Sequence, residues 1–197
     1  MRKTVVIAAL GLALLQLQGC VPLLATGAGA GVLMANDRRT SGAYVEDQEI
    51  ELRIANRVND TFPSDYVHVN VTSYNRTVLL TGEVPDDATK QKINDIAKGV
   101  SNVKNVGNEL VIAPPALLSA RTNDAYVTAK VKTRFADAHR FPLTAVKVVT
   151  ENGVVYLLGL VTDQEGADAA QIASTTAGVT KVVKMFEYVV LIPKNAN

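Results

Sequence analysis

The strongest constraint on the fold is an internal repeat. When the sequence is shifted against itself by 77 positions, identical residues occur in order, and after one deletion the match continues at an offset of 76. The identical pairs include Asp47 with Asp124, Arg57 with Arg134, Val69 with Val146, Val71 with Val148, Asn75 with Asn152, Val78 with Val155, Leu80 with Leu157, Gly82 with Gly159, Val84 with Val161 and Val103 with Val179. The prolines of Ala113-Pro114-Pro115 separate the copies, because proline fixes φ and discourages regular structure. Such a chain is expected to fold as two similar small domains.

Each copy carries the same order of secondary-structure signals. A helical spacing of apolar residues comes first, then two segments with apolar residues at every second position, then a second helical spacing and a last strand. The first helix of each copy is predicted from Ile50, Ile54 and Val58 and from Val127, Val131 and Phe135. This order predicts an α+β fold of two tandem αββαβ two-layer sandwiches, each a three-stranded sheet covered by two helices.

Turn and capping residues support the pattern. Asn152-Gly153 is a strong hairpin signal, because both turn positions need φ > 0, whereas Asn75-Arg76 is a weaker one. Asp86 is expected to cap the second helix of the first copy. Thr162 and Glu165 are expected to form a capping box at the same place in the second copy. Gly82 and Gly159 end the central strands, where they are expected to permit close backbone packing rather than to bind phosphate.

The first residues have the form of an export signal. Arg2 and Lys3 precede the apolar run Val5–Leu15, which suits a signal peptide and is too short to span a bilayer. Leu17-Gln18-Gly19-Cys20 resembles the lipobox of bacterial lipoproteins, which implies removal of residues 1–19 and acylation of Cys20. The alternative is an ordinary secreted protein. By the sorting rules of such lipoproteins, Val21 after the cysteine implies export to the outer membrane, with the periplasmic face expected and surface exposure left open.

Residues 20–45 are predicted to be the acylated cysteine and a membrane tether. Val21–Ala35 is apolar and rich in glycine, so a transmembrane span is the alternative, but the segment is shorter than the roughly 20 residues that a span needs. The expected domains are then residues 46–114 and 115–192, followed by a tail at 193–197. The second copy is expected to fold when it is separated from the first.

The repeated unit resembles the BON domain. The resemblance rests on the Val-x-Leu-x-Gly strands that end at Gly82 and Gly159 and on the later stretches that lead to Val106 and Val182. The lipobox, Asp37-Arg38-Arg39-Thr40-x-Gly42 and two such units together are similar to dual-BON outer-membrane lipoproteins. This resemblance implies a non-enzymatic protein without a cofactor. It also implies binding of anionic phospholipid through the first helix of the second unit, and support of outer-membrane integrity and assembly.

The candidate lipid-binding residues are Tyr126, Val127, Lys130 and Arg134, on a helix expected over residues 123–138. Tyr126, Lys130 and Arg134 are spaced four apart, beside the core stripe that contains Val127. An aromatic residue next to cations suits a headgroup interface. The alternative is an ordinary solvated helix face, and the match of Arg134 with Arg57 favours a role in the fold. The equivalent helix of the first copy carries Glu49, Glu51 and Asp60, so it suits an anionic membrane less well.

Composition argues against several other functions. The chain has 20 Lys and Arg against 19 Asp and Glu, a net charge of +1, which gives no global attraction to nucleic acid. It has one Cys and two His, and His68 is expected to face solvent without metal-binding partners. No Gly-x-Ser-x-Gly or phosphate-loop motif is present. Neither a catalytic residue nor a metal ligand is therefore predicted.

Other function classes remain as alternatives. A protein–protein adaptor for outer-membrane assembly machinery would use the exposed edges of the small sheets. A hydrolase and a cytolysin are less favoured, because the sequence shows no nucleophile–base motif and no long amphipathic hairpin. The oligomeric state and the protein partner are not predicted by the sequence.

Overall fold

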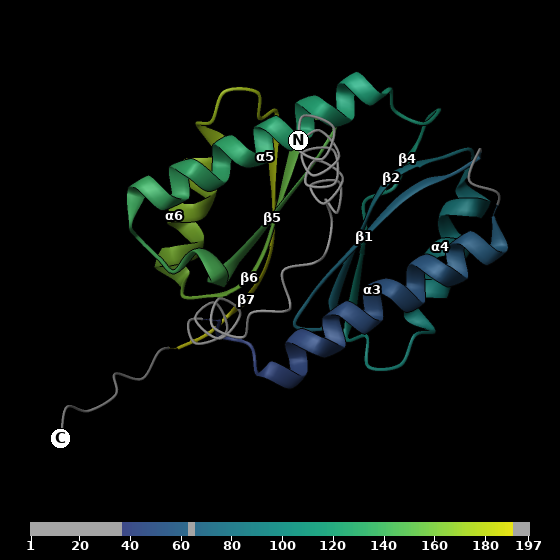
Figure 1. The fold of residues 1–197 in the computed structure, drawn as a ribbon, viewed down its shortest axis with the longest axis horizontal. Coiled ribbons are helices and arrows are strands. Elements are labelled where there is room, and N and C mark those ends of the chain that lie inside the picture. The colour runs from purple at the N-terminus through teal and green to yellow at the C-terminus, as the bar shows by residue number, and fades with distance from the viewer. Residues whose placement is uncertain (1–36, 63–65, 191–197) are drawn as a thin grey trace, which may run out of the picture. The chain divides into compact units, whose positions relative to one another are not determined.

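The computed structural model describes residues 37–62 and 66–190 (Figure 1). The predicted signal peptide, Cys20 and most of the predicted tether lie outside the described residues, as does the tail at 193–197. Residues 36–197 form one compact unit. Within the described part of the chain, no helix is long and apolar enough to cross a membrane.

The element order confirms the repeated αββαβ pattern. The first copy contains α3 (Ser41–Thr61), β1 (His68–Tyr74), β2 (Thr77–Val84), α4 (Asp87–Lys98), β3 (Asn105–Asn108) and β4 (Val111–Ile112). The second copy contains α5 (Leu118–Ala138), the 3-10 turn η1 (Leu143–Ala145), β5 (Val146–Glu151), β6 (Val154–Val161), α6 (Asp163–Ser174) and β7 (Lys181–Tyr188). The fold is therefore α+β, as predicted.

Each sheet is built around its second strand. In the second copy, β6 pairs antiparallel with β5 and parallel with β7. In the first copy, β2 pairs antiparallel with β1, but its parallel neighbour is interrupted, so β3 and β4 pair with it separately. The Asn108 side chain accepts a hydrogen bond from the Leu110 N–H at 3.3 Å within this break. The first sheet thus has four strands where three were expected.

The capping residues and the two strand-end glycines fall where they were predicted, whereas the first helix of each copy begins earlier than expected. Asp86 accepts a hydrogen bond from the Thr89 N–H at 2.7 Å, and Thr162 and Glu165 form the capping box. A side chain on Gly82 or Gly159 would approach a backbone carbonyl oxygen to 2.0 or 2.3 Å, so both positions serve close backbone packing. α3 begins at Ser41, so residues 41–45 of the expected tether are helical. α5 begins at Leu118 rather than near residue 123, and its N-cap residue makes no side-chain capping bond that would mark the start.

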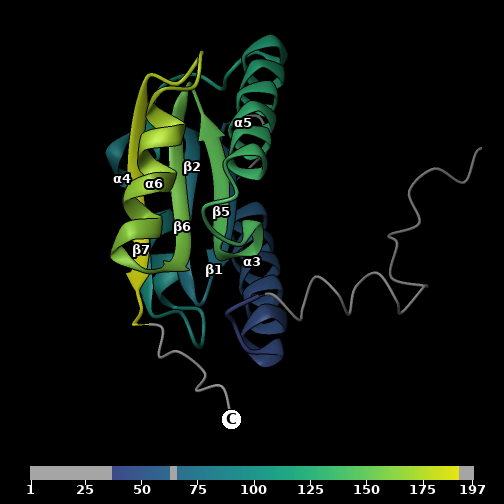
Figure 2. The same cartoon turned by 90° about the vertical axis from the view of Figure 1, so that its left-hand side faces the viewer.

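Among the described residues, three hydrophobic clusters hold the two copies together. One lies between the helices and sheet of the first copy, and one lies between those of the second copy. The third joins the two copies, because the faces of the two sheets turned away from the helices pack together (Figure 1). Its buried members are Tyr74, Leu79, Tyr156, Leu158 and Leu160. The outer side of the second sheet is covered by α5 and α6, as Figure 2 shows.

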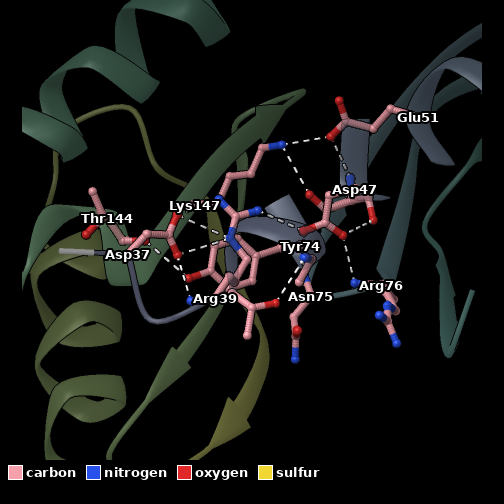
Figure 3. Close-up of polar contacts among 12 residues, drawn as sticks. Asp37, Arg39, Asp47, Glu51, Tyr74, Asn75, Arg76, Thr144 and Lys147 are labelled. Carbon is pink, nitrogen blue, oxygen red and sulfur yellow. Dashed lines mark hydrogen bonds and ion pairs between the residues drawn. The ribbon is translucent and has the colours of Figure 1, made fainter. Parts of the chain in front are cut away.

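A polar network crosses the same interface beside this cluster (Figure 3). Lys147 of the second copy bonds to Glu51 at 2.8 Å, and Glu51 accepts the Ser73 N–H at 2.7 Å. Tyr74 donates from its hydroxyl to the Thr144 carbonyl oxygen at 3.2 Å. Burial raises the pKa of Tyr74 to about 12, so the hydroxyl keeps its proton.

The segment before α3 is bound across both copies. Arg38 forms paired hydrogen bonds of 2.6 Å with Glu165 and a bond of 2.8 Å with the Leu160 carbonyl oxygen. Arg39 bonds to Asp47 at 2.8 Å, and its guanidinium lies 4.1 Å from the centroid of the Tyr74 ring. The chain therefore enters the folded unit at a fixed point.

Candidate functional site

The outward face of α5 carries exposed apolar side chains. Tyr126 is 63% exposed, and Leu118, two turns earlier on the same side of the helix, is 78% exposed. Ala129 and Thr133 continue this face and are also exposed. The sequence pattern does not mark Leu118 as part of this face, because it predicts a helix that starts after this residue. In the sequence, Leu118 is notable only as an apolar residue that lies outside the spacing of the core residues Val127, Val131 and Phe135.

Val127 does not belong to this surface. It is fully buried and packs with Val131 and Phe135 in the core of the second copy. Since no part of its side chain reaches the surface, its place among the candidate lipid contacts is wrong. Its membership of the core stripe, in contrast, is confirmed.

Lys130 and Arg134 lie on the side of α5 that faces the end of α6. The Lys130 ammonium lies 4.6 Å from the centroid of the Tyr126 ring, a cation–π contact, and it donates to the Ala177 carbonyl oxygen. Arg134 donates to the Ile172 carbonyl oxygen at 2.9 Å and to the Thr176 hydroxyl at 2.8 Å. The structure thus brings Tyr126, Lys130 and Arg134 to one place.

These side chains line a hollow between α5 and the end of α6. Its lining consists of Tyr126, Ala129, Lys130, Thr133, Arg134, Thr175, Thr176 and Ala177. It combines an aromatic ring, two cations and three threonine side chains, which are the groups that recognise an anionic headgroup with an apolar neighbour.

Arg134 also has a structural role that its partner in the first copy shares. Arg57 donates to the carbonyl oxygen of Gly99, which caps the end of α4, at 3.1 Å. Arg134 makes the corresponding contact in the last turn of α6. A cation at the carboxyl end of a helix satisfies free carbonyl groups and is favoured by the helix dipole. The repeat therefore preserves this arginine because it ties the two helices of each copy together.

The first helices of the two copies differ strongly in charge. α5 contains four basic and two acidic residues, a net charge of +2, and one of its acids, Asp124, is buried. α3 contains two basic and five acidic residues, a net charge of −3. The two copies share the fold of this helix, but its net charge is negative in the first copy and positive in the second. The two helices therefore suit different surroundings.

His68 is only partly exposed, at 18% of its side chain, whereas its strand pattern predicted a solvent-facing residue. The face of β1 that carries it packs against the second copy, and its Nδ1 lies 2.8 Å from Glu83 Oε2. Glu151 of the second copy completes a cluster with these two residues. Burial favours a raised pKa for Glu83, but hydrogen bonds from Asn152, the Ala116 N–H and His68 outweigh it and hold that pKa below its usual value.

A model of the BON domain matches residues 46–114 and 123–189. The chain therefore belongs to the BON-domain family, with two copies of the domain.

Among known proteins, the chain is similar to the Outer membrane lipoprotein DolP of Haemophilus influenzae. The two are 39% identical over 173 residues, which cover 87% of this chain and 90% of the relative. Together with the two matched domains, this similarity defines a DolP-like, dual BON-domain lipoprotein of the outer membrane.

Two further relatives are less similar. The chain is 31% identical over 154 residues to the 21 kDa hemolysin of Actinobacillus pleuropneumoniae, covering 78% of this chain and 79% of that protein. It is 27% identical over 160 residues to the Osmotically-inducible protein Y of Escherichia coli, covering 80% of each. The similarity to each of these two relatives thus extends over most of both chains.

Proposed function

We propose that the chain is a non-enzymatic lipoprotein, anchored through Cys20, that binds anionic phospholipid with α5 and supports outer-membrane integrity and assembly. The observation that carries the proposal is the contrast between the equivalent helices. α5 presents an exposed tyrosine and a net charge of +2, while α3 has a net charge of −3. An anionic surface therefore attracts one face of the molecule and repels its counterpart.

The contacts around Tyr126 suit a headgroup interface. The ring and the Lys130 ammonium already lie together, so less side-chain freedom is lost on binding. Burying the aromatic side chain contributes about 1–2 kcal/mol, and a cation near anionic lipid contributes about 1 kcal/mol. Arg134 contributes positive charge from a fixed position, because α6 holds its guanidinium. Such a surface gives weak binding by itself.

The acyl anchor at Cys20 strengthens this weak membrane binding. Acyl chains on this residue hold the folded unit beside the membrane and raise the effective concentration of the α5 surface there. Cys20→Ala is expected to abolish acyl labelling and leave the precursor unprocessed, as measured by metabolic labelling with a fatty acid. Acylation of this variant would show that the anchor lies elsewhere.

The test of the lipid surface compares two equally exposed residues. Tyr126 and Leu52 are each 63% exposed, on α5 and α3 respectively. Tyr126→Ala in residues 36–197 is expected to lower affinity for phosphatidylglycerol vesicles about tenfold, which corresponds to 1.4 kcal/mol, with little change in melting temperature. Leu52→Ala is expected to leave the affinity unchanged. Flotation of both variants with vesicles measures the effect.

Equal binding by Tyr126→Ala and the parent chain would reject α5 as the lipid surface. The adaptor for outer-membrane assembly proteins would then be the better proposal. The edge strand β4 supports that alternative, since Val111 and Ile112 are both exposed. Cross-linking at this strand would capture the protein partner.

A further inference from the structure

The interface between the two copies contains a cluster of metal-ligating side chains that the lipid surface does not use. His68 and Glu83 come from neighbouring strands of the first copy, and Glu151 ends β5 of the second copy. One ligand atom from each of the three lies within 4.8 Å of the other two. Glu83 is 1% exposed and Glu151 is 7% exposed, so both carboxyl groups are removed from solvent.

We propose that His68, Glu83 and Glu151 bind a divalent transition-metal ion of the zinc type, which joins the two BON domains. One imidazole nitrogen and two carboxylate oxygens form a ligand set that zinc accepts, at ligand distances of about 2.0–2.2 Å. The separation of 2.8 Å between His68 Nδ1 and Glu83 Oε2 is short enough for both atoms to bind one ion. A ligand atom of Glu151 lies within 4.8 Å of both, so binding of one ion by all three residues draws the Glu151 carboxylate toward the other two.

The charge of the cluster favours a cation. Two buried carboxylates repel each other at low dielectric constant unless a positive charge lies between them. In the described part of the chain, no lysine or arginine pairs with Glu83 or Glu151, and His68 is the one basic partner of Glu83. A dication at this position compensates both carboxylates.

Neighbouring residues hold the ligands in place. Asn152 donates to Glu83 Oε1 at 2.9 Å, and the Ala116 N–H donates to Glu83 Oε2 at 3.1 Å. Asn70 donates to Glu151 Oε2 at 2.8 Å. Hydrogen bonds of this kind orient metal ligands in advance. They come from both copies and from the linker, so the site exists only when the two copies are packed together.

The internal repeat shows that the fold does not require this cluster. At the offset of 77, the positions of His68, Glu83 and Glu151 correspond to Ala145, Leu160 and Tyr74. That trio also meets at the interface, where the Tyr74 hydroxyl donates to the Ala145 carbonyl oxygen at 3.4 Å and the Tyr74 ring packs in the same cluster as Leu160. One of these two equivalent places in the interface is thus filled by the Tyr74 side chain and the Ala145 backbone. The other holds the three side chains that can ligate a metal, His68, Glu83 and Glu151.

The experiment titrates zinc into the full chain in detergent, with Cys20→Ser present so that the thiol cannot bind. Calorimetry is expected to show one ion per chain, and zinc is expected to raise the melting temperature. His68→Gln and Glu151→Gln are each expected to weaken binding at least tenfold. His139→Gln is the matched control, because His139 is the other histidine of the chain and is exposed.

A second measurement uses the chain in which His68, Glu83 and Glu151 are unchanged, so it does not depend on whether the variants fold. Zinc is expected to shift the side-chain nitrogen NMR signal of His68 and to leave that of His139 unchanged. Absence of heat and of any His68 shift at micromolar zinc would overturn the proposal, as would a loss of binding in His139→Gln alone. Calcium that raises the melting temperature as much as zinc would overturn the assignment to a transition metal.

Discussion

Asp47 and Asp124 occupy the same position in the two repeats, and each binds both backbone amides of its own hairpin turn. Asp124 accepts from the Asn152 N–H at 2.8 Å and from the Gly153 N–H at 2.9 Å. Asp47 accepts from the Asn75 N–H at 2.8 Å and from the Arg76 N–H at 2.7 Å. Both aspartates are buried. Since each lies on the first helix of its copy, these hydrogen bonds fix the hairpin turn to the helix that covers the sheet.

This contact explains why the weaker turn of the first copy still forms. Asn75 and Arg76 both have positive φ, at 50° and 68°. The second of these positions holds an arginine where the second copy has Gly153, so the backbone is strained there. Asp47 offsets that cost with two charge-assisted hydrogen bonds, and it also accepts from the Ser73 hydroxyl at 2.7 Å.

Replacing the buried aspartate is expected to destabilise the fold. Asp124→Asn keeps one acceptor oxygen but turns an amide NH₂ toward a backbone N–H, so one donor is left without a partner. The free energy of unfolding is expected to fall by about 2–3 kcal/mol, as measured by urea denaturation. Asp60→Asn, at an exposed position of α3, is the control and is expected to stay within about 0.5 kcal/mol of the parent. Equal effects of the two substitutions would contradict the assigned role of Asp124.

The sequence predicted the elements well because their signals are local. The helices followed from apolar spacing, α4 and α6 also from their caps, and the second turn from Asn152-Gly153. The repeat showed that Asp47 and Asp124 are equivalent, but it did not show what these aspartates do in the structure. Each aspartate bonds to a turn 28 or 29 residues away, and such a contact leaves no periodic signal.

The candidate site was predicted less completely, and the interface between the copies was missed. An alternating strand has one apolar face and one polar face, and the pattern does not distinguish water from a polar domain as the neighbour of the second face. His68 was therefore expected in solvent, although it lies against Glu83. Tyr126, Lys130 and Arg134 were brought together as expected, whereas the α6 contacts of the two cations required the tertiary structure.

The ion pair between Arg38 and Glu165 is expected to make stability depend on pH. The hydrogen bonds from Arg38 hold the pKa of Glu165 at about 2, below its usual value of 4.5. A carboxyl group with a lowered pKa in the folded state stabilises the fold above its unfolded pKa, and this contribution is lost as the pH falls toward its folded pKa. Arg38→Gln is therefore expected to lower the melting temperature at neutral pH, with a gap that narrows between about pH 4.5 and pH 2.

Thermal unfolding at a series of pH values measures this gap. A small difference is expected to remain in acid, because Arg38 also donates to the Leu160 carbonyl oxygen. Arg53→Gln is the control, since its pair with Glu49 is solvent-exposed and such pairs contribute little at any pH. A gap for Arg38→Gln that stays constant across this range would show that Glu165 is not the group responsible.

The packing of the two sheets is expected to couple the stability of the two domains. Leu157 and Leu158 are adjacent on β6 and equally buried, but Leu157 lies in the core of the second copy and Leu158 in the cluster between the copies. In residues 36–197, either substitution by alanine is expected to cost about 2–5 kcal/mol of unfolding free energy. In residues 116–197 alone, Leu158 has no partner sheet, so Leu158→Ala is expected to cost little there, while Leu157→Ala keeps its effect.

Urea denaturation of both variants in both chain lengths gives the comparison. The isolated second copy retains its own core and is expected to fold with lower stability than it has in the pair, because Tyr156, Leu158 and Leu160 become exposed. The same variants report on the first copy, since Leu158→Ala in the long chain is expected to shift the unfolding of both domains together. An equal cost of Leu158→Ala in the two chain lengths would mean that this side chain stabilises its own domain and that the two copies unfold independently.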